Sequence, residues 1–126
     1  MAGPRQRKAA TGLTHLRITL SDSFYIGPGR ADLMSSVAET GSISEAAKRM
    51  GMSYKRAWSL VQALNEGFGA PLIETMRGGK EQGAALSAAG AEVLERYRAM
   101  QAAARQAISR DFEALERLQL DMSKRK

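Results

Sequence analysis

The chain has 126 residues, of which 19 are Lys or Arg and 13 are Asp or Glu, so its formal net charge is +6. This length supports one compact domain with an appendage, and 44% hydrophobic residues exclude a disordered polyelectrolyte. With no cysteine and a single histidine, His15, the composition excludes a disulfide framework and leaves too few ligands for zinc or a Ser/His/Asp hydrolase, so we expect no metal and no cofactor.

Residues 1–13 contain basic residues but no hydrophobic periodicity, which predicts a mobile basic arm. Residues 1–30 carry +4 of the net charge. This segment is either a solubilising tail or an arm that lies along nucleic-acid phosphates. No apolar stretch approaches the roughly 20 residues of a membrane span, and none follows the basic residues as in a secretory signal. We therefore expect a cytoplasmic protein with no membrane partner.

A folded domain is predicted over residues 14–87, beginning with a short strand. Leu16, Ile18 and Leu20 alternate with polar residues, a period of two that is typical of a half-buried strand. His15 falls on the outward face of this strand, where we expect it to have no functional role.

Residues 31–40 predict a helix that follows the breaker Gly27-Pro28-Gly29 and ends at Gly41. Its inward-facing residues are expected to be Leu33, Met34 and Val37.

Two helices joined by a tight turn come next. Ser42 or Ser44 can cap the first helix, which closes at Gly51 after barely two turns. Ser53 can cap the second, which runs to about Gly67. Two helices joined by a turn of about three residues that contains glycine indicate a helix-turn-helix.

The second of these helices separates an apolar stripe from a polar face when residues 54–68 are wound at 100° per residue. The stripe consists of Ala57, Val61, Leu64 and Phe68, flanked by Leu60 and Tyr54. Its first turns are basic and rich in hydrogen-bonding groups, as in a recognition helix that contacts base edges in the major groove. The candidate DNA-binding residues are Ser53, Tyr54, Lys55, Arg56, Trp58, Ser59 and Gln62. The alternative is an ordinary solvated helix face.

Tyr54 and Trp58 are adjacent on one edge of this helix, because they are four residues apart. Two interpretations stay open: the rings belong to the rim of the core, or they pack on the sugar-phosphate backbone or a thymine methyl group. Ser42 and Ser44 are candidate phosphate contacts, since hydroxyls and free N–H groups meet at a helix N-terminus.

A wing is predicted after the second helix. Residues 72–77 resemble a strand, residues 77–83 a glycine-rich loop, and residues 84–86 a return strand. The candidate DNA-binding residues of the wing are Arg77, Gly78, Gly79 and Lys80. A solvated hairpin tip is the alternative.

Ser87 is expected to cap a final helix over residues 88–122, which is followed by a basic tail at 123–126. At about 50 Å this helix is too long for the core of one small domain. A heptad pattern predicts a homodimer interface made of Leu94, Tyr97, Ala104, Ile108, Leu115 and Leu118. A helix folded back on its own domain is the alternative. The predicted class is therefore mainly α with a small β wing: a winged helix-turn-helix plus a long C-terminal dimerisation helix.

Several segments resemble one known family. Residues 41–48, Gly-Ser-Ile-Ser-Glu-Ala-Ala-Lys, and residues 51–58, Gly-Met-Ser-Tyr-Lys-Arg-Ala-Trp, are similar to the N-terminal DNA-binding domain of ModE-type molybdate-responsive regulators. Residues 71–74, 77–80 and 85–87 agree with this likeness, as does Gly90. The same region more distantly resembles the winged helix-turn-helix of LysR-type regulators. The resemblance covers roughly residues 14–100.

This resemblance implies a dimeric bacterial transcription regulator that binds double-stranded DNA at a palindromic operator and is associated with the nucleoid. In that family, oxyanion-binding sensor domains follow the DNA-binding part. A chain of 126 residues leaves no room for them, so direct molybdate binding is not expected. We expect a sequence-specific regulator that is not an enzyme. The alternatives are a non-specific architectural DNA-binding protein and a winged-helix adaptor for another protein.

Overall fold

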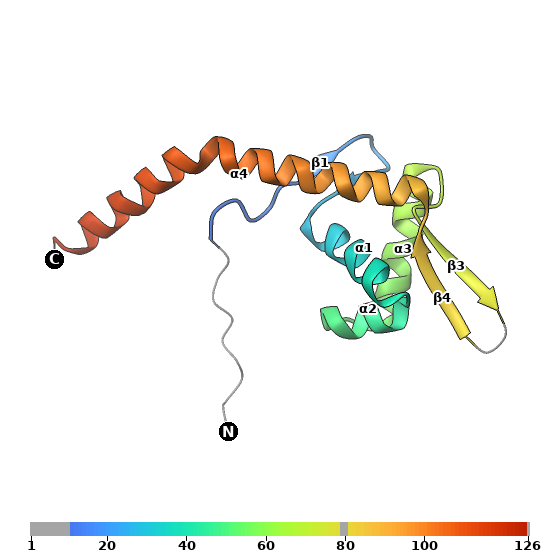
Figure 1. The fold of residues 1–126 in the computed structure, drawn as a ribbon. Coiled ribbons are helices and arrows are strands. Elements are labelled where there is room, and N and C mark those ends of the chain that lie inside the picture. Colours follow the sequence, from blue (N-terminus) through green and yellow to red (C-terminus); the bar gives the residue numbers. More distant parts are fainter. Residues whose placement is uncertain (1–10, 79–80, 126) are drawn as a thin grey trace, which may run out of the picture.

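The computed structural model describes residues 11–78 and 81–125. The elements in chain order are β1 (Ile18–Thr19), β2 (Tyr25–Ile26), α1 (Pro28–Thr40), α2 (Ile43–Met50), α3 (Tyr54–Phe68), β3 (Ile73–Gly78), β4 (Glu81–Leu86) and α4 (Ala88–Ser123). Helices α1 to α3 pack together, the β3–β4 hairpin projects from them, and α4 crosses the domain and extends far beyond it (Figure 1). The predicted class, mainly α with a small β wing, is confirmed.

The core lies between the three short helices, the hairpins and the first half of α4. Leu33, Met34 and Val37 are fully buried, as their spacing in α1 predicts, and Val61 and Leu64 of α3 pack against them in the same cluster. Each such side chain stabilises the fold by about 1.5–3 kcal/mol relative to leaving it exposed. Among residues 11–78 and 81–125, no helix combines the length and the hydrophobicity that crossing a membrane requires.

Helix α1 begins three residues earlier than its predicted start at Ala31, so reading Gly27-Pro28-Gly29 as a breaker was wrong. Gly27 is the N-cap and Pro28 occupies the first turn. Proline is favourable there because its fixed φ suits a helix and its missing N–H would have no partner within the helix. The predicted end is confirmed, since Gly41 closes the helix at φ 71°.

The predicted N-terminal strand is reduced to a two-residue pairing in which Ile18 faces Ile26. Leu16 and Ile18 pack against the core, but Leu20 is 63% exposed, so its inward placement was wrong. The reason is a turn: the amide of Leu20 donates to the carbonyl of Phe24, so the chain reverses before Leu20 can reach the interior.

The tip of this hairpin is joined to the end of α3. The hydroxyl of Ser23 donates to the carbonyl of Gly67 at 3.1 Å, and a Cβ atom at Gly67 would lie 2.2 Å from the carbonyl oxygen of Ser23. Only glycine permits this approach. Phe68 packs edge-on against Phe24 with ring centroids 5.2 Å apart. It remains 36% exposed, so it borders the core at the end of the predicted stripe.

The wing is a longer hairpin than predicted. Strands β3 and β4 are antiparallel, with Ile73 opposite Leu86 and Gly78 opposite Glu81. Continuous pairing therefore replaces most of the loop expected over residues 77–83, because hydrogen bonds between strands join backbone groups, which glycine also supplies. The amide of Ala84 donates to the carbonyl of Gly41 at 2.9 Å, which ties the wing to the corner between α1 and α2.

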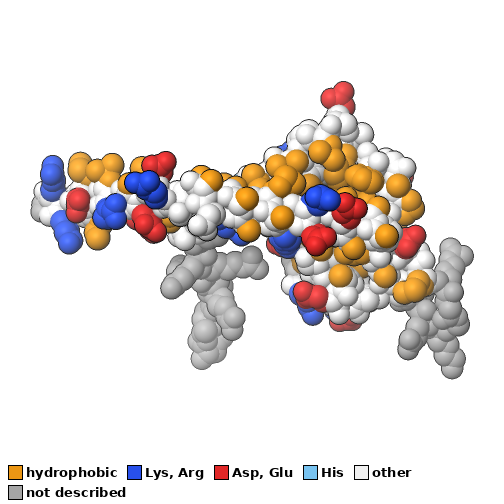
Figure 2. Space-filling view, turned by 45° about the horizontal axis from the view of Figure 1, so that its top comes forward, with side chains coloured by type: hydrophobic (Ala, Val, Ile, Leu, Met, Phe, Trp, Pro, Cys, Tyr) orange, Lys and Arg blue, Asp and Glu red, His pale blue; other side chains and the backbone are white. Residues whose placement is uncertain are grey.

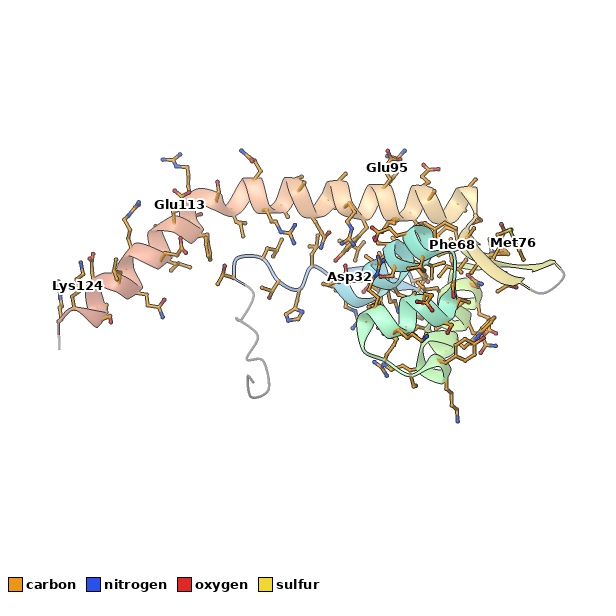
Figure 3. All side chains as sticks on the ribbon, turned by 60° about the horizontal axis from the view of Figure 1, so that its bottom comes forward. Asp32, Phe68, Met76, Glu95, Glu113 and Lys124 are labelled. Atoms are coloured by element: carbon orange, nitrogen blue, oxygen red, sulfur yellow. The ribbon has the colours of Figure 1, made fainter. Side chains whose placement is uncertain are left out.

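The predicted final helix is confirmed, with Ser87 as its cap. One residue assigned to a dimer interface belongs instead to the domain's own packing, because Tyr97 is fully buried. Leu94 packs against the core but is only partly buried, so its place in an interface stays a prediction. The heptad pattern was misleading there because a helix that packs on its own domain shows the same apolar spacing as one that packs on a partner. Arg98 pairs with Asp32 of α1 at 2.9 Å, whereas Glu95 points away from the domain (Figure 3).

Tyr97 also anchors the N-terminal segment. Its hydroxyl donates to the carbonyl of Leu16 at 2.7 Å, and the side-chain amide of Gln101 donates to the same hydroxyl at 3.3 Å. Replacing Tyr97 by Phe is expected to lower the free energy of unfolding by about 1–2 kcal/mol, because the buried amide of Gln101 and the part-buried carbonyl of Leu16 lose their partner. Urea denaturation at neutral pH checks this. Tyr54→Phe is the control, since Tyr54 is half exposed.

The same variant has a pH signature. Burial raises the pKa of the Tyr97 hydroxyl above its ordinary value of 10.0, while Arg98 acts in the opposite direction. Because the folded state favours the neutral phenol, this contribution to stability is complete below pH 10.0 and is lost as the pH rises through the folded-state pKa. The wild type is therefore expected to lose stability above that pH more steeply than Tyr97→Phe. Parallel profiles would rule this out.

Candidate nucleic-acid interface

The corner between α2 and α3 is fixed by two side-chain caps and one glycine. The hydroxyl of Ser42 accepts the amide of Glu45 at 3.1 Å, and the hydroxyl of Ser53 accepts the amide of Arg56 at 3.1 Å. Gly51 ends α2 at φ 68°, a backbone conformation that favours glycine. Both predicted caps, Ser42 and Ser53, are confirmed, and α3 leaves the turn in a defined direction.

The predicted polar face of α3 is exposed. Lys55, Arg56, Ser59 and Gln62 all reach solvent, while Ala57 on the opposite side is fully buried. No carboxylate within the described part of the chain forms an ion pair with Lys55 or Arg56. The start of α3 therefore presents positive charge and hydrogen-bonding groups that are available to an external ligand.

Tyr54 and Trp58 form an edge-to-face pair with ring centroids 6.2 Å apart. Trp58 packs against the core, whereas Tyr54 is 50% exposed. Together they form a wall of a cleft of about 160 Å³ that also includes Ser42, Ser44 and Met76. The pair therefore borders the core and also faces an open cleft between α2, α3 and the wing.

The wing residues are placed only in part. Arg77 and Gly78 end β3, while the predicted contacts Gly79 and Lys80 lie outside the described residues. The described strands set the direction of the hairpin, which projects beside α3 (Figure 1).

Asn65 is a positioning residue that sequence reasoning missed. Its side-chain oxygen accepts the amides of Leu72 at 2.8 Å and Ile73 at 3.1 Å, and its side-chain amide donates to the carbonyl of Ile73 at 2.9 Å. These three bonds fix the first strand of the wing to the end of α3. The only sequence signal is an asparagine shortly before Gly67 and Gly69. Such a pattern is too general to predict these three hydrogen bonds.

The remaining residues of the predicted dimer interface lie on the second half of α4. Ala104 is partly buried, Ile108 borders a small hollow together with Leu13, and Leu115 and Leu118 are exposed. No three His, Cys, Asp or Glu side chains come together as a metal site within residues 11–78 and 81–125.

Comparisons with known proteins place this geometry among DNA-binding domains. Residues 31–91 match the family described as bacterial regulatory helix-turn-helix protein, lysR family. Among solved structures, the chain is similar to that in a crystal structure of a CbnR DBD–DNA complex, with 31% identity and a TM-score of 0.55 over 69% of this chain and 95% of that one.

Two curated relatives match the same region. The molybdenum-pterin-binding protein MopB of Rhodobacter capsulatus is 42% identical over 78 residues, which are 61% of this chain and 29% of that protein. The transcriptional regulator ModE of Haemophilus influenzae is 37% identical over 83 residues, which are 65% of this chain and 32% of that protein. The chain thus spans about a third of the length of these relatives.

Proposed function

We propose that this chain, whose helix-turn-helix domain belongs to the lysR family of bacterial regulatory proteins, is a sequence-specific transcription regulator. The likeness to ModE-type domains that the sequence indicates is confirmed by the curated relatives. In the proposal the protein acts as a homodimer on a palindromic operator, in the bacterial cytoplasm at the nucleoid, and without catalysis.

The observation that carries this proposal is the exposed start of α3. Lys55, Ser59 and Gln62 face outward from a helix whose first turn is held by Ser53. Lys and Arg can donate to guanine O6 and N7, and glutamine can bridge the edge of adenine. The Tyr54 and Trp58 side of the same helix faces the wing across the cleft, where a sugar-phosphate backbone would pass.

Dimerisation is supported by apolar surface that one chain leaves open. Val93 and Met100 of α4 line a groove of about 400 Å³, and apolar side chains gather along α4 and over the adjoining domain face (Figure 2). Wound at 100° per residue, Leu115 and Leu118 lie on the same face of α4 as Val93 and Met100. A second copy packed on this face would supply the second α3 helix that a palindromic operator requires, since helix-turn-helix dimers bind half-sites about 34 Å apart.

Replacing Lys55 by Ala tests the proposal. We expect roughly tenfold weaker binding to the preferred duplex and poorer discrimination at one base position of each half-site, because the variant no longer donates a hydrogen bond to that base edge. Fluorescence anisotropy with a set of single-base operator variants measures both effects. Lys124→Ala, which removes the same charge at the end of α4, is the control.

The alternative, non-specific architectural binding, is supported by the net charge of +6. It predicts nearly equal affinity for the operator and for unrelated DNA, whereas a specific regulator prefers its operator by a factor of about 10³ or more. Equal affinities in the wild type would overturn the proposed function.

A further inference from the structure

A basic cleft lies on the other side of α3, between the N-terminal hairpin and the start of α1. Its volume is about 460 Å³. Arg17 from the segment before β1, Arg30 from the first turn of α1 and Arg56 from α3 line it, together with Tyr25 and Met52. None of its lining residues is acidic. Three cationic side chains from three separate segments therefore converge on one hollow.

Two of these arginines are stacked on the same aromatic ring. The guanidinium carbon of Arg17 lies 3.6 Å from the ring centroid of Tyr25, and that of Arg30 lies 3.8 Å from it. At these distances the two groups must occupy opposite faces, because on one face they would overlap. The attraction of each cation to the ring offsets part of their mutual repulsion. The ring of Tyr25 thus holds two positive charges near each other.

Arg30 is held by the backbone as well. Its Nη1 donates to the carbonyl of Tyr25 at 2.9 Å, while its Nε is buried and has no hydrogen-bond partner. Other arginines of the domain have carboxylate partners: Arg49 pairs with Glu39, and Arg98 pairs with Asp32. Within the described part of the chain, no carboxylate forms an ion pair with any of the three cleft arginines. Preorganised cations without a counter-charge favour an external anion.

The first turn of α1 adds to this potential. Its N-cap, Gly27, supplies no side-chain acceptor, and the turn contains no acidic residue. The positive end of the helix dipole, with the N–H groups of Gly29 and Arg30 that have no partner within the helix, therefore borders the cleft. The hairpin that carries Arg17 is itself fixed, since Tyr97 and Gly67 bond to it on both sides of β1.

We infer that this basic cleft binds a backbone phosphate of double-stranded DNA. The inference rests on the proposed function and concerns the DNA strand opposite the one beside the wing. On α3, Arg56 lies on one side of the Lys55–Ser59–Gln62 face, and Tyr54 and Trp58 lie on the other. A major groove has a sugar-phosphate backbone on each side. With α3 in the groove, one backbone would contact the basic cleft and the other would contact the cleft between α2, α3 and the wing. Guanidinium groups suit phosphate oxygens because their N–H donors are arranged in a planar fork.

Arg17→Gln and Arg30→Gln test this inference, with Arg110→Gln on the exposed surface of α4 as a matched loss of charge. Anisotropy titrations of each variant use the preferred duplex and an unrelated duplex at several KCl concentrations. We expect roughly tenfold weaker binding to both duplexes, and a logarithmic salt dependence shallower by about one for each phosphate that the variant no longer neutralises. Arg110→Gln should leave both quantities at the wild-type value.

Arg17 is exposed, so its substitution leaves the core intact; thermal melting of each variant verifies folding. Unchanged affinity and salt dependence for Arg17→Gln, in a protein whose wild type still discriminates its operator, would overturn the inference and leave the proposed function standing. If the wild type binds its operator no more tightly than unrelated DNA, the proposed function is overturned instead. Calorimetric titration with inorganic phosphate distinguishes a DNA phosphate from a free oxyanion as the ligand of the cleft. If the wild type binds inorganic phosphate tightly, and Arg17→Gln abolishes this binding but leaves the affinity for DNA unchanged, the cleft binds a free oxyanion and the inference is overturned.

Discussion

Replacing Leu118 by Asp is expected to convert the proposed dimer to monomers at working concentrations and to weaken binding to the proposed operator about 100-fold or more. In the proposed two-fold interface each dimer would bury two such carboxylates, and an unpaired buried charge costs several kcal/mol. Since about 1.4 kcal/mol corresponds to a tenfold change in an equilibrium constant, the dimer dissociation constant rises by at least two orders of magnitude. A monomer also loses the second half-site, which the linked α3 helix reaches at high effective concentration.

The same helix provides a close control. Leu118 and Leu120 are both 56% exposed in the single chain, but at 100° per residue they point to nearly opposite sides of α4. Leu120→Asp makes the same chemical change outside the proposed interface and is expected to leave the oligomeric state unchanged. Sedimentation velocity and anisotropy with operator DNA measure both variants. A dimeric Leu118→Asp protein, or equal loss in the two variants, would refute the proposed interface.

Replacing Gly90 by Ala is expected to lower the free energy of unfolding by about 3 kcal/mol or more. A Cβ atom there would lie 2.0 Å from the carbonyl oxygen of Leu72 and 2.9 Å from its carbonyl carbon. Backbone atoms cannot rotate out of the way as a side chain would, so the start of α4 must separate from the bend at Leu72 that leads into β3. The bond from the amide of Ser87 to the same carbonyl, 2.9 Å long, would be strained as well.

Gly29→Ala is the contrasting substitution for this test. A Cβ atom at Gly29 meets nothing within 4 Å, and alanine is the better helix former, so stability is expected to stay equal or rise by up to about 1 kcal/mol. Urea denaturation monitored by circular dichroism compares the two variants with the wild type. A Gly90→Ala protein as stable as the wild type would show that α4 and Leu72 do not pack as described.

Local signals account for most of the correct sequence predictions. Ser42, Ser53 and Ser87 cap their helices as predicted, and Gly41 and Gly51 end theirs, because capping and left-handed closure depend on residues within one turn. The errors fall where a local pattern has two physical explanations. An apolar heptad position fits both a partner's helix and the helix's own domain, and burial of Tyr97 favours the second.

Contacts between distant segments could not be predicted in this way. Asn65 bonds to the strand that follows it, and Arg17, Tyr25 and Arg30 meet in one stack because the N-terminal hairpin folds against α1. Their sequence spacing follows no helix or strand period. Nothing in the composition distinguishes these arginines from those on the exposed surface of α4.

The amino-acid sequence by itself determined the order of the helices, their caps and the polar first turns of α3, since each depends on neighbours a few residues away. Only the tertiary structure decided which side chains meet across the domain. The hydroxyl of Tyr97 and the carbonyl of Leu16 are 81 residues apart in the chain, and such a pairing exists only once the whole core has closed around it.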